Sequence, residues 1–222
     1  KTSKEAVKVY REGRGPKLGL LGVDLIRLTL ERAKTAREAI KVIGSLVEKY
    51  GQFGSGVPAS NHAEGSYDNS YIIADSKEAW VIVKVGHHWI AKQIPTGTYS
   101  ISNEPSIRTE WTLSSRDLVD YAVKKGWWPT SLKDSFDFAR AYIDEETPLH
   151  LSHPRVMVTR KLLHEKERCI SLRWMMRVAR DHYEDTFLEG PYFEASLPDF
   201  LTIDMYVSPA GFTWGNTASS CV

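Results

Sequence analysis

The chain has 222 residues, with 29 basic and 28 acidic side chains and a formal net charge of +1. This near balance gives no electrostatic basis for binding nucleic acid or an anionic membrane surface. No apolar run approaches the roughly 18 to 20 residues that a transmembrane helix needs, and the chain is long enough to bury a sizeable core.

The two cysteines, Cys169 and Cys221, lie far apart in the sequence and do not suggest a disulfide framework. None of the four asparagines begins an N-x-Ser/Thr glycosylation motif. The composition therefore favours a reducing, cytoplasmic location.

The pattern of the first 50 residues predicts a polar segment followed by two helices. Residues 1–17 are rich in Lys, Arg and Gly, which predicts a surface connection. Residues 18–33 carry Leu and Ile at helical spacing. A second helix over residues 35–50 opens with a Thr-x-x-Glu capping box and stops at Gly51. Its predicted core face consists of Ala36, Ile40, Ile43, Leu46 and Val47.

Residues 51–69 are rich in Gly, Ser and Asn and long for a connection, so we expect a candidate site loop there. Residues 70–107 follow as a predicted meander of antiparallel strands. The strands are expected at 71–74, 79–85, 89–94 and 98–102. In the second strand Trp80, Ile82 and Lys84 alternate with Val81, Val83 and Val85, so each set lies on one face of the sheet.

The meander ends in Ser102-Asn103-Glu104-Pro105, which places an amide side chain at a predicted strand end. Strand ends often carry functional groups. The residues alone favour the simpler interpretation, in which Asn103 caps the turn before Pro105. Both interpretations stay open at this point.

Residues 115–183 are predicted to be mainly helical, with strands returning over 200–222. The helices are expected at 115–125, 136–142, 153–164 and 171–183, and the strands at 200–207 and 217–222. Helices and strands that alternate in blocks indicate an α+β protein with layered antiparallel sheets.

Several other groups carry more than one interpretation. Asp181 and His182 could form a dyad or support local structure, and Cys169 could be a reactive or a structural thiol. Trp127 and Trp128 could stack on a ligand or fill a core. Adjacent His87 and His88 point to opposite faces of a strand, and the other histidines match no metal-binding spacing. We therefore predict no metal and no cofactor.

Several segments resemble one family in the same order along the chain. They are GVDLIRLTLERAKTAREAIKVIGSLVEKYGQ at 22–52, ADSKEAWVIVKVGHHWIAK at 74–92, ISNEPSI at 101–107, LVDYAVKKGWW at 118–128, FDFARAY at 136–142 and RDHYEDT at 180–186. The chain is similar over most of its length to the secernin family and the related cysteine dipeptidases. These belong to the N-terminal nucleophile hydrolases.

This resemblance implies a four-layer αββα sandwich with antiparallel sheets and a cysteine nucleophile at the mature N-terminus. Residue 1 is Lys, and neither cysteine lies near it. We therefore expect that residues 1–222 are one incomplete hydrolase domain, that the nucleophile lies upstream, and that this fragment alone is inactive.

The resemblance also suggests two site residues. Asn103 resembles the asparagine that bile salt hydrolase and penicillin V acylase place beside their cysteine, where it donates to an oxyanion or orients the α-amino base. Arg155 resembles an arginine that lies near the nucleophile, and such a guanidinium stabilises a thiolate or holds a carboxylate. Arg155 also fits as a helix-surface residue paired with an acid.

The function implied by the resemblance is cysteine-type hydrolysis of small amides, with dipeptides favoured. The expected partner is a small peptide or amide, with no nucleic acid and no membrane span, and the sequence does not indicate an oligomeric state. The alternative is a non-catalytic, secernin-like protein involved in regulated secretion.

Overall fold

The structure is a computed structural model that describes residues 3–14, 19–53, 67–146, 152–189 and 202–205. The chain divides into two compact units. The first contains residues 1–95 and 105–147, and the second contains residues 96–104 and 148–222.

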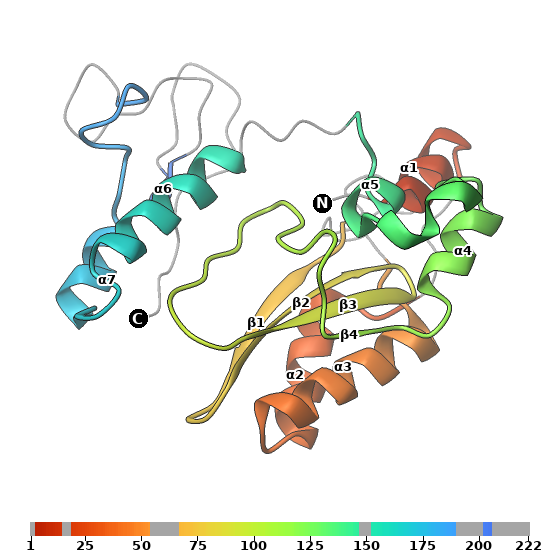
Figure 1. The fold of residues 1–222 in the computed structure, drawn as a ribbon, viewed down its shortest axis with the longest axis horizontal. Coiled ribbons are helices and arrows are strands. Elements are labelled where there is room, and N and C mark those ends of the chain that lie inside the picture. Colours follow the sequence, from red (N-terminus) through yellow and green to blue (C-terminus); the bar gives the residue numbers. More distant parts are fainter. Residues whose placement is uncertain (1–2, 15–18, 54–66, 147–151, 190–201, 206–222) are drawn as a thin grey trace. The chain divides into compact units, whose positions relative to one another are not determined.

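The elements confirm the predicted α+β class (Figure 1). The helices are α1 (Lys4–Arg11), α2 (Gly22–Arg32), α3 (Ala36–Tyr50), α4 (Leu118–Lys124), α5 (Phe138–Tyr142), α6 (His153–Glu165) and α7 (Leu172–Val178), with a 3-10 helix η1 (Thr130–Ser135). The strands are β1 (Ser70–Ala74), β2 (Ala79–Val85), β3 (His88–Ile94) and β4 (Leu113–Ser114).

The four strands form one antiparallel sheet in the order β1-β2-β3-β4. Ile82 of β2 pairs with Tyr71 of β1 and with Ala91 of β3. The prediction of β2 is confirmed residue for residue, and the predictions of β1 and β3 are confirmed to within one residue.

The core of the first unit lies between this sheet and the pair α2 and α3, which lie along one face of it (Figure 1). Trp80 and Ile82 of β2 are fully buried there against Ile40 and Val47 of α3. The valines of β2 on the opposite face are buried as well. A strand buried on both faces belongs to an interior layer of a protein, not to its surface.

Helix α3 forms as predicted, because its ends carry clear signals. The Thr35 hydroxyl accepts a hydrogen bond from the Glu38 backbone N–H at 3.2 Å, and Gly51 ends the helix with φ of 70°. The Glu38 carboxylate accepts from the Lys34 N–H, one residue before the position expected for a capping box. Of the predicted core face, Leu46 alone is only partly buried.

Gly44 of α3 lies directly beneath the Trp89 ring, so a larger residue has no room. A Cβ on Gly44 would lie 2.6 Å from Cζ2 of Trp89, and the indole is held by a 2.9 Å hydrogen bond from Nε1 to the Glu48 carboxylate. We expect Gly44→Ala to lower the free energy of unfolding. Overpacking costs about 1–3 kcal/mol, whereas the helix propensity of alanine returns about 1 kcal/mol.

Urea denaturation measures this change, with Ser45→Ala as the matched control on the exposed face of the same helix. We expect the control to stay within about 0.5 kcal/mol of the wild type. A stabilised Gly44→Ala variant would show that helix propensity outweighs the contact with Trp89.

The predicted strand over residues 98–102 is wrong. Pro95 follows the last residue of β3, and Gly97 turns the chain with φ of 85°. The neighbour of β3 is instead the short strand β4, which pairs with Ile90 and Ala91. Residues 98–102 have strand-like composition, but no strand in the described part of the chain pairs with them. Pairing decides whether such a segment becomes a strand.

Two further predictions need correction, one for a segment that was not predicted to be helical and one for the end of a helix. Within the predicted polar connection, Lys4–Arg11 forms α1, where Ser3 Oγ caps the helix by accepting from the Ala6 N–H at 3.1 Å and Val9 is buried. The helix predicted to reach Tyr183 ends at Val178, where the hydrogen bonds of the next residues become i to i−3, from the Arg180 N–H to the Arg177 carbonyl at 3.0 Å. Tyr183 itself adopts a left-handed backbone with φ of 69°, which a helix cannot contain.

Some predictions lie outside the described residues. These are most of the candidate loop 51–69, nearly all of the returning strands at 200–222, and Cys221. No helix among the described residues is long and apolar enough to cross a membrane.

Candidate active site

Asn103 and Arg155, the two site residues that the family resemblance suggests, are in direct contact in the second unit. Arg155 Nη2 donates a 2.7 Å hydrogen bond to Oδ1 of Asn103, although the two residues lie 52 positions apart. Asn103 is exposed at a bend and does not end a strand as predicted. The structure therefore brings the two candidates together but changes the local setting of Asn103.

The start of α6 positions the guanidinium. Ser152 is the N-cap, Pro154 occupies the first turn, and Arg155 is the next residue. Proline is tolerated in the first turn because its missing N–H would have no partner inside the helix. Arg155 therefore sits on a regular first turn that faces the bend at Asn103.

The contact also sets the direction of the Asn103 amide. A guanidinium has only donors, so the group that it meets must be the carbonyl oxygen and not the NH2 group of the amide. With Oδ1 occupied by Arg155, the Nδ2 hydrogens point away from the arginine. The exposed bend thus presents an amide N–H donor whose orientation is held by a charged partner.

Glu104 is a further polar residue at this site, and the sequence analysis did not select it. Its side chain is only 13% exposed, and its carboxylate lies 3.2 Å from Nδ1 of His153 and accepts a long 3.4 Å hydrogen bond from Ser152 Oγ. In the sequence, Glu104 is a single acidic residue followed by a proline, a pattern that is common in turns. No local signal distinguishes it.

Burial and nearby groups act in opposite directions on Arg155. Burial lowers the pKa of its guanidinium, and Tyr183 and Glu104 act to raise that pKa. Arginine stays protonated in proteins because its ordinary pKa is so high. Burial also raises the pKa of Tyr183 to about 12, so this phenol is neutral at physiological pH. The site thus holds one positive charge beside a neutral phenol.

The segment after α7 supports local structure. Asp181 Oδ1 accepts a 3.0 Å hydrogen bond from the Tyr183 N–H and stabilises its left-handed backbone. The His182 ring lies 3.3 Å from the Glu184 carboxylate, so a charged partner of this ring is its neighbour two residues further on. Burial raises the pKa of Asp181 to about 6. The structural interpretation of this segment is the one that the geometry supports.

The remaining candidates lie elsewhere. Cys169 is exposed, which argues against the interpretation of its thiol as structural. Arg160, a second arginine of α6, has its guanidinium carbon 5.8 Å from the centroid of the Tyr99 ring. Trp128 is 7% exposed and donates from Nε1 to the Leu132 carbonyl, as expected for a core residue.

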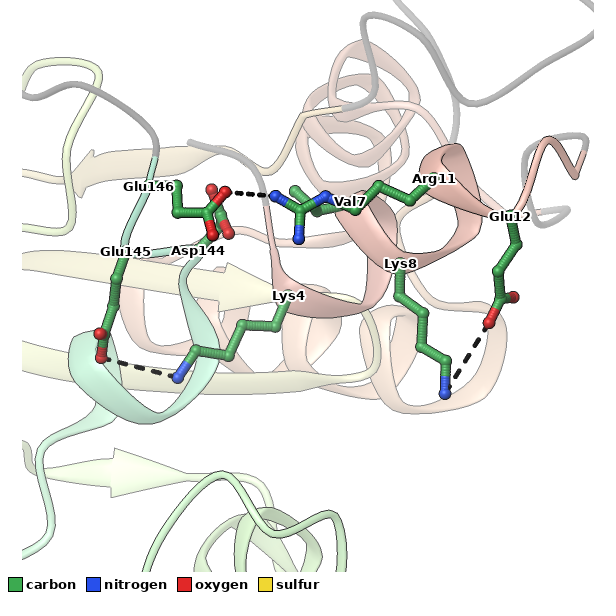
Figure 2. A pocket seen from close by; sticks show the side chains of 8 residues that line it. All are labelled: Lys4, Val7, Lys8, Arg11, Glu12, Asp144, Glu145 and Glu146. Atoms are coloured by element: carbon green, nitrogen blue, oxygen red, sulfur yellow. Dashed lines mark hydrogen bonds and ion pairs between the residues drawn. The ribbon is translucent and has the colours of Figure 1, made fainter.

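A groove in the first unit, of about 510 Å³, lies between α1 and residues 144–146 (Figure 2). Its charges are paired with one another, with Arg11 bonded to Glu146 and Lys4 Nζ 3.8 Å from the Glu145 carboxylate. Paired, exposed charges of this kind attach α1 to its neighbour and contribute little net energy.

A second, smaller pocket of about 270 Å³ in the first unit lies beside His88. His88 Nε2 is 3.3 Å from Asp117, and the ring packs on Tyr121 with centroids 4.3 Å apart. Burial lowers the pKa of His88. None of the described residues that line this pocket is a serine, threonine or cysteine, so it offers no nucleophile for amide hydrolysis.

Comparison with known proteins gives consistent results. The profile of Peptidase family C69 matches residues 13–196. A protein named "Probable dipeptidase A" from Streptococcus pyogenes serotype M18 (strain MGAS8232) is 24% identical over 200 residues, which cover 79% of this chain and 39% of the relative. Its counterpart from serotype M3 (strain SSI-1) is also 24% identical, with 40% of the relative covered. The chain thus spans about two fifths of the length of these relatives.

Proposed function

Because the chain belongs to Peptidase family C69, we propose that it is part of a cysteine-type N-terminal nucleophile hydrolase that cleaves small amides, with dipeptides as the favoured substrates. The family match supports a peptidase, and the names of the two streptococcal relatives support a dipeptidase. The resemblance to secernins and cysteine dipeptidases seen in the sequence is confirmed at the level of this family.

The fold that accompanies this proposal is the four-layer αββα sandwich. A four-stranded antiparallel sheet with α2 and α3 on one face, and buried side chains on the other, is what one half of such a sandwich requires. We treat residues 1–222 as one part of that domain. The proposed location is the cytoplasm, on the basis of the two widely separated cysteines.

The observation that carries the proposal is the hydrogen bond between Arg155 and Asn103. Thiol attack on an amide carbonyl produces a tetrahedral intermediate whose oxygen carries negative charge, and an oriented N–H donor stabilises it. Because Arg155 occupies Oδ1, the Asn103 amide is held as a donor. This favours the oxyanion role over the alternative in which its carbonyl orients the base.

Arg155 has two roles in the proposed mechanism. It fixes the Asn103 amide, and its charge favours a thiolate or a substrate carboxylate nearby. The proposal assigns the nucleophile to a cysteine at the mature N-terminus, whose α-amino group takes the thiol proton. Neither Cys169 nor Cys221 fits that role by position.

Thiol alkylation with a dipeptide assay tests the proposal. We expect the full-length protein to release free amino acids from dipeptides, and iodoacetamide to abolish this release because the thiolate is the nucleophile. Mass spectrometry of the alkylated protein would identify the modified residue, and a dipeptide present in excess should protect it.

The exposed Cys169 would also react with iodoacetamide, so the matched background is Cys169→Ser. This variant should keep full turnover and should still be inhibited. Turnover that survives complete alkylation would contradict the cysteine mechanism. Absence of any dipeptide turnover would favour the non-catalytic, secernin-like alternative.

A further inference from the structure

Glu104 contacts the same helical turn that carries Arg155. Its carboxylate accepts from the hydroxyl of Ser152, which is 4% exposed, and pairs with Nδ1 of His153. Asn103, the residue directly before Glu104, accepts a hydrogen bond from the Arg155 guanidinium through its side-chain oxygen. Two consecutive residues, Asn103 and Glu104, therefore contact the N-cap and the first turn of α6.

The N-cap of α6 lacks the usual hydrogen bond between its side chain and the helix backbone, and the contact with Glu104 takes the place of that bond. An N-cap serine normally accepts a hydrogen bond from an N–H of its own helix. Ser152 makes no such bond, and its hydroxyl donates to Glu104 instead. A carboxylate beside the N-terminus of a 13-residue helix is also favourable for the helix dipole.

The charge of Glu104 acts on Arg155 as well. Arg155 is half buried beside the neutral phenol of Tyr183, and Glu104 is a carboxylate that attracts its guanidinium. A cation removed from water needs such a partner to remain in place. Without Glu104, the guanidinium would gain by turning toward solvent, and the Asn103 amide would lose its fixed orientation.

We propose that Glu104 is a positioning residue that seats the first turn of α6 so that Arg155 holds Asn103 as an oxyanion donor. This inference rests on the proposed hydrolase function. Glu104 touches neither substrate nor nucleophile in this scheme, and it acts through Ser152, His153 and Arg155.

The test is a double-mutant cycle on dipeptide hydrolysis by the full-length protein. We expect Glu104→Ala to lower kcat/KM about 10- to 100-fold, as small displacements of catalytic groups do. In an Arg155→Ala background the same change should cause no further loss, because Glu104 then has nothing left to position. Glu104→Gln should have a kcat/KM between those of the wild type and Glu104→Ala, since its amide oxygen still accepts from Ser152 but the charge that attracts Arg155 is gone.

Glu165→Ala, at the exposed far end of α6, is the matched control and should behave as the wild type. If Glu104→Ala fails to fold, Ser152→Ala replaces it in the cycle, because it removes the donor and leaves the carboxylate. The inference would be overturned if Glu104→Ala lowered kcat/KM by the same factor in the Arg155→Ala background as in the wild type. It would also be overturned if Glu104→Ala alone kept the wild-type kcat/KM.

Hydrogen exchange separates this inference from the proposed function. If the wild type shows no hydrolysis, the proposed function fails, but the amides of residues 153–157 still report how α6 is seated. Faster exchange there in Glu104→Ala than in Glu165→Ala supports the seating role. Equal exchange in the two variants overturns it.

Discussion

Asn103→Ala is expected to lower kcat for dipeptide hydrolysis by about 10²–10³-fold, the usual loss when one oxyanion donor is removed. Asn103 is exposed at a bend, so the substitution should leave the fold intact. KM should change little, because the oxyanion forms only after substrate has bound. Steady-state kinetics with one dipeptide measures both constants.

Asn103→Asp is the decisive companion variant. Aspartate keeps the size of asparagine and an oxygen that accepts from Arg155, but it has no N–H donor. We therefore expect Asn103→Asp to be as inactive as the alanine variant. If it retains activity, the carbonyl oxygen of Asn103 is the functional atom, and the residue orients the base instead. Thr109→Ala, at an exposed position a few residues further on, should leave kcat unchanged.

The buried Lys84 leads to the second large prediction. Its side chain is 0% exposed, and Nζ has no hydrogen-bond partner among the described residues. The ammonium lies 4.9 Å from the centroid of the Tyr71 ring, and Asp68 is the nearby acid. Burial lowers the pKa of Lys84 to about 7, against the attraction of Asp68. The cost of desolvation thus exceeds the gain from the pair.

Asp68 shows the same balance. Burial raises its pKa to about 6, although the Gly86 N–H donates to its Oδ1 at 3.0 Å and Lys84 attracts it. Replacing buried charged pairs with groups of similar volume often stabilises a protein by about 1–4 kcal/mol. We expect this gain from the double variant Lys84→Met/Asp68→Asn at pH 7, measured by urea denaturation. Asparagine retains an oxygen for the Gly86 N–H.

The effect should depend on pH in a defined way. Between its ordinary pKa of 3.8 and about 6, Asp68 binds more protons when folded, so stability falls as pH rises. Between about 7 and its ordinary 10.5, Lys84 binds more protons when unfolded, so stability rises with pH. The advantage of the double variant should be greatest between pH 6 and 7 and should shrink toward pH 4 and toward pH 10.

Lys92→Met is the matched control on the neighbouring strand. Lys92 is 38% exposed in its side chain and forms a 3.1 Å ion pair with Glu110 at the surface. Such pairs are worth about 0–1 kcal/mol, so the control should change little. A double variant that is less stable than the wild type at pH 6 to 7 would show that the buried pair is net favourable.

Elements with strong local signals could be predicted from the sequence. Helix α3 has a cap at Thr35, a regular apolar face and a glycine stop, and β2 alternates cleanly between two faces. The segment 98–102 has equally good strand composition, yet among the described residues its one β-bridge joins Ser102 to Glu104, and it pairs with no strand. Strand formation requires a neighbour, and no pattern within five residues reports whether one is present.

The candidate site shows the same division. Asn103 and Arg155 were predicted from a family resemblance, and the structure places them 2.7 Å apart. Glu104 was not predicted, because its role depends on contacts with Ser152 and His153, about 50 positions away. Lys84 was predicted to share a sheet face with Trp80 and Ile82, but alternation does not indicate that Asp68 is the acid near its ammonium group.

The sequence by itself indicated the family through segments that resemble it along most of the chain. It also determined the α+β class and most of the helices and strands, because caps, turns and periodicity act within a few residues along the chain. Only the tertiary structure decided which way the Asn103 amide points, which acid contacts Ser152 and His153 at the start of α6, and which lysine is buried. These features depend on groups that are distant in sequence and meet only when the chain packs. Their energies come from desolvation and hydrogen bonding at the point of contact.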